Sequence, residues 1–221
     1  MNQPDIKLFK FRDDFERAGQ IGLCATSIEG IRAHLGADWQ ELAKPVGKRE
    51  TRLREARKLV KHLIRVASES TDFYRTVDFI SRAAAATVEQ ARVRNQWKSL
   101  AGHLAPSAEL THEHMVPCEV VLRELAAAPA GVPLAGLLEP LTYRALVCKK
   151  KEIRTLDKPA LRSRLPALAE TGLAAAPPRQ EPMPEAFKAL MRYDAAGLLH
   201  ELIPVSARAA HLKQAYLAWI G

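Results

Sequence analysis

A repeat of apolar residues at helical spacing, between residues 48 and 70, constrains the fold of this chain more than any other feature. In KRETRLREARKLVKHLIRVASES, apolar side chains recur at Leu53, Ala56, Leu63 and Val66, with Leu59 or Val60 between them. Steps of three and four residues place these side chains on one face of an α-helix. The other faces are densely basic, so the segment predicts an amphipathic helix with one buried side.

The rest of the chain adds more helices and little sheet. We expect a short helix over residues 21–35, a long helix from Ser70 or Thr71 to about residue 104, and a helix over 117–128 that begins at Pro117. Two further amphipathic helices are expected at residues 184–202 and 206–221, and LTYRALVC, residues 141–148, is the best strand. The predicted fold class is mainly α with a small α+β insert.

The same patterns divide the chain into four segments. Residues 1–105 form a helical region that contains the basic helix, and residues 106–171 form the α+β insert. Residues 172–184, GLAAAPPRQEPMP, are rich in Ala and Pro and read as a linker, and residues 185–221 form a C-terminal helical pair.

Composition indicates a soluble protein of a reducing compartment. The chain has 221 residues, of which 48% are hydrophobic and 26% charged, and no apolar run approaches the ~18 residues that a membrane helix needs. Its first residues lack the apolar core of a secretory signal. Cys24, Cys118 and Cys148 are odd in number and form no CxxC pair, so neither a disulfide framework nor a zinc knuckle is indicated. We therefore expect a cytoplasmic protein with no membrane partner.

Positive charge is concentrated in one part of the chain. The net charge is +8, and residues 51–100 hold 11 Lys and Arg against 5 Asp and Glu. A polyanion such as nucleic acid is the natural partner of such a surface, although a solvated basic helix that binds nothing is the alternative. The candidate phosphate contacts on the basic helix are Arg54, Arg57, Lys58 and Lys61.

The segment THEHMVP, residues 111–117, carries the sharpest chemical signal. Imidazole titrates near neutral pH, and a glutamate offers a hard oxygen for a divalent cation. Adjacent side chains of a strand point to opposite faces, so Glu113 and His114 can serve one site only if the strand bends or ends there, which Pro117 favours. The alternative is a polar stretch in which Thr111 or Glu113 caps the following helix without any metal.

EHMVP at 113–117 and VCKKKEIRTL at 147–156 together resemble the His-Me finger (ββα-metal, HNH-type) endonucleases. The resemblance implies a hairpin followed by a helix, with His114 as general base and His112 on the same side of the strand, touching phosphate. It implies that Glu113 and Glu152 hold one divalent metal, Mg²⁺ or Mn²⁺. Basic residues around this module would contact phosphates: Arg144, Lys149, Lys150, Lys151 and Arg154.

The chain departs from the family pattern in three ways. It has no clear counterpart of the middle Asn, the helix lacks a second His, and no zinc-holding CxxC pair is present. The predicted function is metal-dependent hydrolysis of phosphodiester bonds, with DNA favoured over RNA and a homodimer favoured if both strands are cut. The alternative is a non-catalytic helical protein that binds nucleic acid or another protein.

Overall fold

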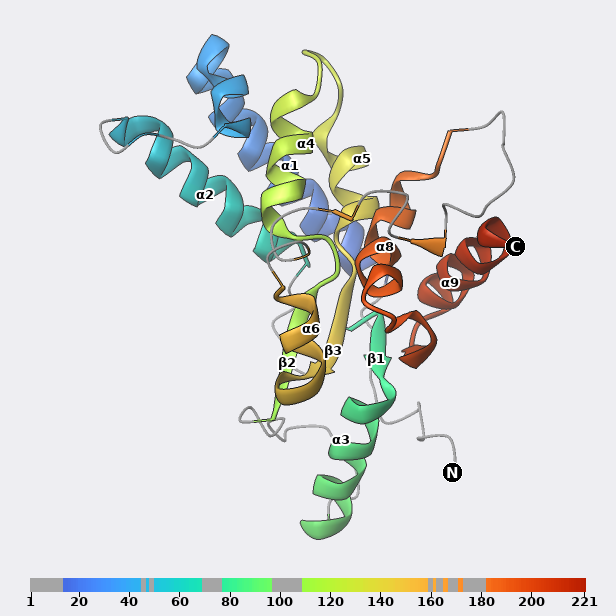
Figure 1. The fold of residues 1–221 in the computed structure, drawn as a ribbon. Coiled ribbons are helices and arrows are strands. Elements are labelled where there is room, and N and C mark those ends of the chain that lie inside the picture. The colour runs from blue at the N-terminus through green and yellow to red at the C-terminus, as the bar shows by residue number, and fades with distance from the viewer. Residues whose placement is uncertain are drawn as a thin grey trace.

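The computed structural model describes residues 14–44, 47, 50–68, 77–96, 109–158, 161, 165–166, 171–172 and 182–221. Helices dominate this part of the chain, and one small mixed sheet lies at its centre (Figure 1). The predicted fold class, mainly α with a small β-containing insert, is confirmed.

The sheet has four strands in the order β2-β3-β1-β4. The strands are β1 (Phe79–Ser81), β2 (Leu110–His114), β3 (Arg144–Cys148) and β4 (Leu202–Pro204). β2 and β3 are antiparallel, β3 and β1 are parallel, and β1 and β4 are antiparallel. Every residue of β3 is buried, which explains why its sequence, RALVC, is an almost continuous apolar run.

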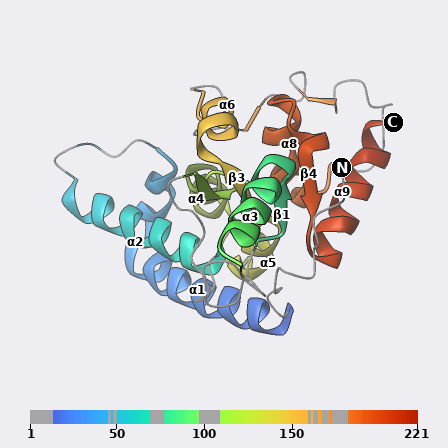
Figure 2. The same cartoon turned by 90° about the horizontal axis from the view of Figure 1, so that it is seen from below.

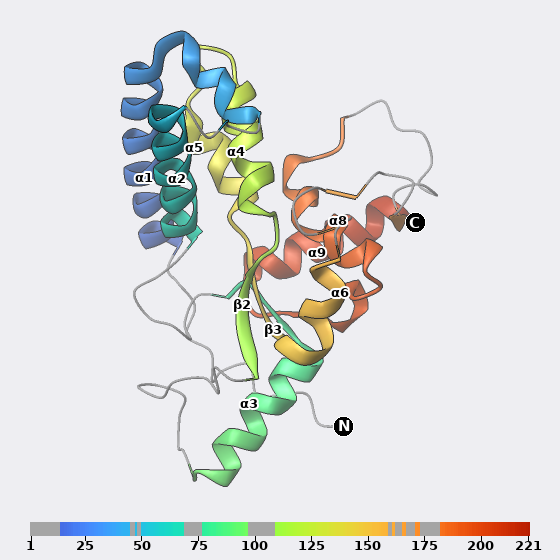
Figure 3. The ribbon, with the colours of Figure 1, turned by 60° about the vertical axis from the view of Figure 1, so that its left-hand side comes forward.

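A helical lobe stands on one end of this sheet (Figure 3). It consists of α1 (Asp14–Leu35), the 3₁₀ segment η2 (Gly36–Ala43), α2 (Thr51–Ser68), α4 (Cys118–Ala127), α5 (Leu134–Leu138) and the short η3 (Glu139–Leu141). Its core contains Ile28, Leu42, Ile64 and Leu125, each at most 2% exposed. The predicted basic helix is confirmed as α2. Val60 and Ile64 are buried in this lobe, and the other members of the predicted stripe pack half-buried against it: Leu53, Ala56, Leu63 and Val66.

Helices cover both faces of the sheet. On one face, α3 (Arg82–Arg94) packs Ala84 and Val88 against Ile80 and Leu146. The other face meets the C-terminal helices, as Figure 2 shows from below. The elements near this second face are the π-helical turn η4 (Lys149–Ile153), α6 (Arg154–Leu156), η7 (Glu185–Phe187), α8 (Lys188–Ala195), η8 (Leu199–Glu201) and α9 (Ala207–Ile220).

Two predicted helices are interrupted by strands. The expected long helix from Ser70 contains β1, and its described helical part is α3; residues 69–76 and 97–108 lie outside the described residues. Phe79 and Ile80 look like part of a helical stripe, but they are 0% and 1% exposed in the sheet, which buries both faces. The Ser81 hydroxyl accepts a hydrogen bond from the Ala84 backbone N–H and so starts the helix. The predicted helix over 184–202 ends at Ala195 in α8, where Gly197 turns the chain with φ +69°, and its last predicted residue, Leu202, begins β4.

One sheet takes strands from three of the four predicted segments. β1 comes from residues 1–105, β2 and β3 from 106–171, and β4 from 185–221. Residues of these three segments therefore lie in one sheet and share one core. Most of the predicted linker, residues 173–181, lies outside the described residues. No helix within the described ranges has the length and apolar character needed to span a membrane.

Candidate functional site

The two faces of strand β2 present different chemistry. His112 and His114 share a face with Leu110, because side chains two residues apart point the same way. His114 stands opposite Arg144 of β3, and His112 stands opposite Leu146. Glu113 lies on the other face, so the strand separates it from the two histidines.

Glu113 is bound by an arginine from α8. The guanidinium of Arg192, which is 1% exposed, donates from Nη1 to Glu113 Oε1 at 2.5 Å and to the His114 carbonyl at 3.2 Å. Its Nη2 donates to the Leu156 carbonyl at 3.0 Å. Arg192 therefore joins α8, β2 and α6, and Glu113 neutralises its buried charge.

Glu152 is a buried hydrogen-bond acceptor at the opposite end of the sheet. Its Oε2 accepts from Ser81 Oγ at 2.6 Å and from the Cys148 backbone N–H at 2.7 Å, and the residue is 5% exposed. Cys148 and Ser81 are the last residues of the parallel strands β3 and β1. Glu152 thus ties two strand ends together.

The predicted metal ligands do not converge on His114. Glu113 and His114 occupy opposite faces of β2, and both carboxylates are engaged by buried donors. Within the described ranges, no group of three or more His, Cys, Asp and Glu side chains is arranged to hold a metal ion. These residues do not fit the metal site that the resemblance implies, and the Mg²⁺ or Mn²⁺ cofactor stays a prediction.

The His114 ring is oriented by a serine at the end of α2. Its Nδ1 lies 3.0 Å from Ser68 Oγ. The Ser68 hydroxyl has a backbone acceptor of its own, the Arg65 carbonyl at 2.8 Å, so its proton points there. Its oxygen then accepts from a protonated Nδ1, which leaves Nε2 of His114 as the basic nitrogen.

Arginines surround the two histidines. Burial, followed by the charges of Arg144, Arg65 and Arg192 and the neighbouring His112, lowers the pKa of His114 from 6.5 to about 3. Burial and Arg144 lower the pKa of His112 from 6.5 to about 4. Both imidazoles are therefore neutral at neutral pH, half-buried, and placed in a positive field.

The N-terminus of α4 adds to this positive field. Cys118 is the first residue of the helix, and the preceding Pro117 offers no side-chain cap. The Arg65 guanidinium hydrogen-bonds to the Cys118 thiol, with Lys61 nearby, although burial as the dominant cause raises the pKa of that thiol. A helix N-terminus and several cations facing one place favour an anion there.

The basic residues predicted on α2 have mainly structural partners. Arg57 donates to the backbone carbonyls of Leu42 and Lys44 and pairs with Glu119, and Lys61 pairs with the same carboxylate at 2.9 Å. These contacts fasten α2 to η2 and α4. Arg54 and Lys58 are more exposed, and both lie near Glu55, at 3.6 and 2.9 Å.

The predicted basic residues after β3 begin at the end of that strand far from His114. Lys149, Lys150 and Lys151 follow Cys148, which pairs with Leu110, four residues and about 13 Å along the strand from the His114–Arg144 pair. The side chains of Lys149 and Lys150 lie outside the described residues. Lys151 is exposed, as is Arg154 at the start of α6. Among the predicted basic residues whose side chains the structure describes in this part of the chain, Arg144 faces the histidines.

The motif did not reveal three residues that shape the site. Arg65 and Ser68 lie more than forty positions upstream, and Arg192 lies almost eighty positions downstream. The pattern of α2 marks Arg65 as a surface cation, but only the packing of α2 against β2 brings it to His114. The buried charge of Arg192 has no local signal, because its sequence neighbours form an ordinary amphipathic helix.

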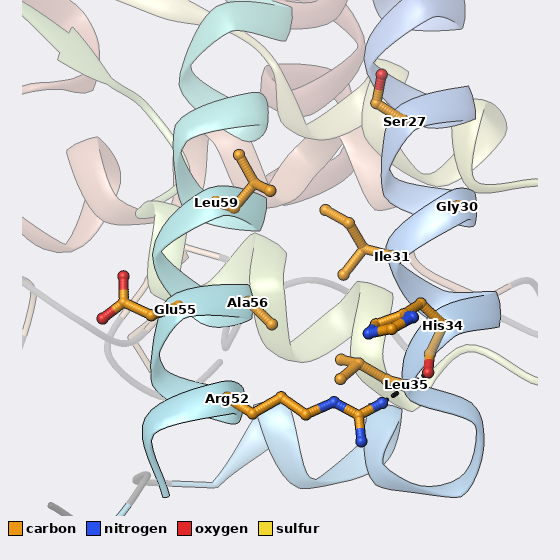
Figure 4. A pocket seen from close by; sticks show the side chains of 9 residues that line it. All are labelled: Ser27, Gly30, Ile31, His34, Leu35, Arg52, Glu55, Ala56 and Leu59. Atoms are coloured by element: carbon orange, nitrogen blue, oxygen red, sulfur yellow. Dashed lines mark hydrogen bonds between the residues drawn. The ribbon is translucent and has the colours of Figure 1, made fainter.

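A pocket lies away from this cluster. It has a volume of about 490 Å³ and opens between α1 and the N-terminal half of α2 (Figure 4). Ile31, Leu35, Ala56 and Leu59 line it, and Arg52 crosses one end, where it donates to the His34 carbonyl at 2.7 Å. His34, Arg52 and Glu55 are the titratable members of its lining.

Comparisons with protein-family models, with curated proteins and with solved structures gave no match. The resemblance to the His-Me finger endonucleases therefore stays a prediction from the sequence.

Proposed function

We propose that this protein binds nucleic acid and cleaves a phosphodiester bond at His114. One observation carries the proposal: His114, His112 and Arg144 share one face of the β2–β3 pair, where Arg65 and the N-terminus of α4 also converge. Neutral imidazoles supply acid–base groups, and the guanidinium groups supply charge for a phosphate.

His114 is the better candidate for the general base. Ser68 holds its Nδ1, so Nε2 keeps the lone pair that accepts a proton from an attacking hydroxyl. Among the described residues, no hydrogen bond to Nε2 of His114 blocks this role. An imidazole with a fixed tautomer and an open nitrogen is the arrangement that general-base catalysis needs.

His112 lies on the same face of β2 as His114, about 7 Å along the strand. Both of its ring nitrogens are buried away from solvent, so His112 shapes this face and does not itself reach the phosphate. A bound phosphate would offset the charge of Arg144, which after burial lowers the pKa of both imidazoles, and the charge of Arg65, which lowers that of His114. Substrate binding therefore raises the pKa of His114 and helps it to hold the proton that it accepts.

The nuclease function and the general base are those predicted from the sequence, but the two predicted metal ligands have structural roles instead. Glu113 neutralises Arg192 and Glu152 joins the ends of two strands, so the proposed mechanism uses neither as a metal ligand. We expect cleavage to persist in EDTA. Activity that EDTA abolishes and Mg²⁺ or Mn²⁺ restores would instead support the metal site that the resemblance implies.

The test uses end-labelled single- and double-stranded oligonucleotides of DNA and RNA, incubated with the wild type, His114→Gln and Arg65→Gln. We expect His114→Gln to lower the cleavage rate by about 10²- to 10⁴-fold while it retains binding. Arg65→Gln should weaken binding by about tenfold, and less at high salt, because it removes one phosphate contact.

Arg82→Gln provides the matched control. Arg82 is an exposed arginine at the start of α3, with Glu201 at 3.9 Å, and its replacement makes the same charge change away from the cluster. Its rate should stay within about twofold of wild type. Equal cleavage by wild type and His114→Gln would refute the proposed base, and binding without cleavage would favour the non-catalytic alternative.

A further inference from the structure

The histidine-bearing face of β2–β3 holds no carboxylate in the part of the chain that the structure describes. Its residues are Leu110, His112 and His114 on β2, and Arg144, Leu146 and Cys148 on β3. Such a face has basic nitrogens and cations, but no hard oxygen ligands with which a divalent cation could be held to activate water.

The nearby carboxylates beyond this face are already paired. Asp78 binds Arg17 at 3.0 Å and also accepts from the Arg144 backbone N–H at 3.0 Å. Glu119 pairs with Lys61 and Arg57. Each of these acids neutralises a cation that holds two elements together, so recruiting either one to a metal would leave a buried or half-buried charge without its counterion.

From this arrangement we infer that the substrate is RNA, which supplies its own nucleophile, the 2′-hydroxyl. The inference rests on the proposed function and narrows it. The 2′-oxygen is held next to the phosphorus by the ribose, and such an intramolecular attack gains an effective molarity of roughly 10⁵ M or more over a free water. DNA lacks this group and would need an activated water, and the described residues of the histidine face include no acid that would assist it.

The reaction balances with no metal and no redox partner. Nε2 of His114 takes the proton from the 2′-hydroxyl as the 2′-oxygen forms a bond to phosphorus. The bond from phosphorus to the 5′-oxygen breaks, and that oxygen takes a proton from a solvent water, whose hydroxide then takes up the proton held on His114. The products are a 2′,3′-cyclic phosphate and a free 5′-hydroxyl, and His114 returns to its neutral form.

The arginines have a defined part in this step. Negative charge grows on the phosphorus-bound oxygens as the fifth bond forms, and fixed cations stabilise that charge most when water is excluded. Arg144 is 8% exposed and stands directly across from His114, while Arg65 approaches from α2 at the solvent side. The phosphate would therefore lie between a buried and an exposed guanidinium.

Three oligonucleotides of one sequence test the inference, all in EDTA: all-RNA, all-DNA, and RNA with a single 2′-deoxyribose at the linkage that the wild type cuts. A fourth strand carries the 2′-deoxyribose one linkage away, as the matched control. We expect the RNA and the control strand to be cut alike, and the all-DNA and site-deoxy strands to be cut about a thousandfold more slowly or worse. Mass spectrometry should show a cyclic phosphate end that is one water lighter than a linear phosphate.

The outcomes separate this inference from the proposed function. Comparable cleavage of the site-deoxy strand, or products with a 5′-phosphate, would overturn RNA self-attack and leave the nuclease proposal standing. Failure to bind or cut any of the strands would overturn both. Cutting of RNA to a cyclic phosphate that His114→Gln slows and Arg82→Gln does not would support both.

Discussion

The ion pair between Glu113 and Arg192 allows the most direct test of whether Glu113 on strand β2 has a structural role or binds a metal. If Glu113 anchors Arg192, as their 2.5 Å contact indicates, replacing either partner destabilises the fold. If Glu113 is instead a metal ligand, its replacement removes activity and leaves stability almost unchanged. We therefore consider Glu113→Leu, Arg192→Met and the double variant, which keep volume and remove charge.

The expected magnitudes follow from burial. The Arg192 side chain is 2% exposed and that of Glu113 is 21% exposed, and removal of one partner of a buried pair costs about 3–5 kcal/mol because the other charge stays uncompensated. Arg192→Met also frees the His114 and Leu156 carbonyls, so it should fall at the upper end. Asp157, at 4.0 Å from Arg192, compensates only in part because its side chain is 48% exposed.

The double variant buries no charge, so its cost should be smaller than the sum of the two single costs. We expect a coupling free energy of about 3 kcal/mol, since replacement of a whole buried pair by apolar residues is often close to neutral. Urea unfolding followed by circular dichroism measures all four free energies of unfolding. Nucleic-acid cleavage by Glu113→Gln, measured well below its unfolding midpoint, supplies the functional readout.

Two results would refute this reasoning. Additive single effects, with coupling below about 0.5 kcal/mol, would show that the contact does not stabilise the fold. A Glu113→Gln variant that unfolds like wild type but has lost all cleavage would return Glu113 to the role of metal ligand.

The remaining predictions concern other buried polar groups. The pKa values of His112 and His114 fall from 6.5 to about 4 and about 3 on folding, so the unfolded chain binds more protons and stability falls as pH drops from about 6.5 toward 3. At pH 5 each imidazole should lower the free energy of unfolding by about 2 kcal/mol relative to neutral pH. Urea unfolding at a series of pH values should therefore show a smaller loss of stability below pH 6.5 in a His112→Gln/His114→Gln double variant. A loss of stability equal to that of the wild type would contradict the pKa directions. Ser81→Ala removes a helix cap and a hydrogen bond to a buried carboxylate, and should lose about 2–3 kcal/mol in urea unfolding, whereas Ser81→Thr should lose less than about half of that. Asp78→Asn leaves Arg17, 9% exposed, without its counterion, and should cost about 3–5 kcal/mol; a melting temperature equal to that of the wild type would contradict the assigned pair.

Short sequence patterns predicted those helices and strands that depend mainly on residues close together in the sequence. The apolar stripe of α2, the proline that precedes α4 and the β-rich run of β3 are each readable within about ten residues. β1 is only three residues long, and its neighbours continue a helical pattern, so nothing in the sequence marks Phe79 as a strand residue. Its conformation is decided by pairing with β3 and β4, whose paired residues lie 66 and 121–125 positions away.

The candidate site was likewise predictable where its residues are neighbours in the sequence, and not where they come from distant segments. THEHMVP identifies the two histidines, and the alternation of a strand already requires Glu113 to face away from His114 unless the strand bends. The structure shows β2 extended through His114, so the bend does not occur before the motif's histidine. The partners that give each side chain its role, Ser68 for His114 and Arg192 for Glu113, come from distant helices, and only tertiary packing selects them.

The position of β1 between β3 and β4 has a consequence for dissecting the molecule. A chain cut in the Ala- and Pro-rich stretch after residue 172 loses β4, and the outer hydrogen-bonding edge of β1 is then open to any extended segment that it meets. The same cut also removes α8 and α9 from the second face of the sheet and exposes Phe79, Ala145 and Val147 to water. Such a fragment should self-associate, which makes the intact chain the smallest unit suited to biochemical work.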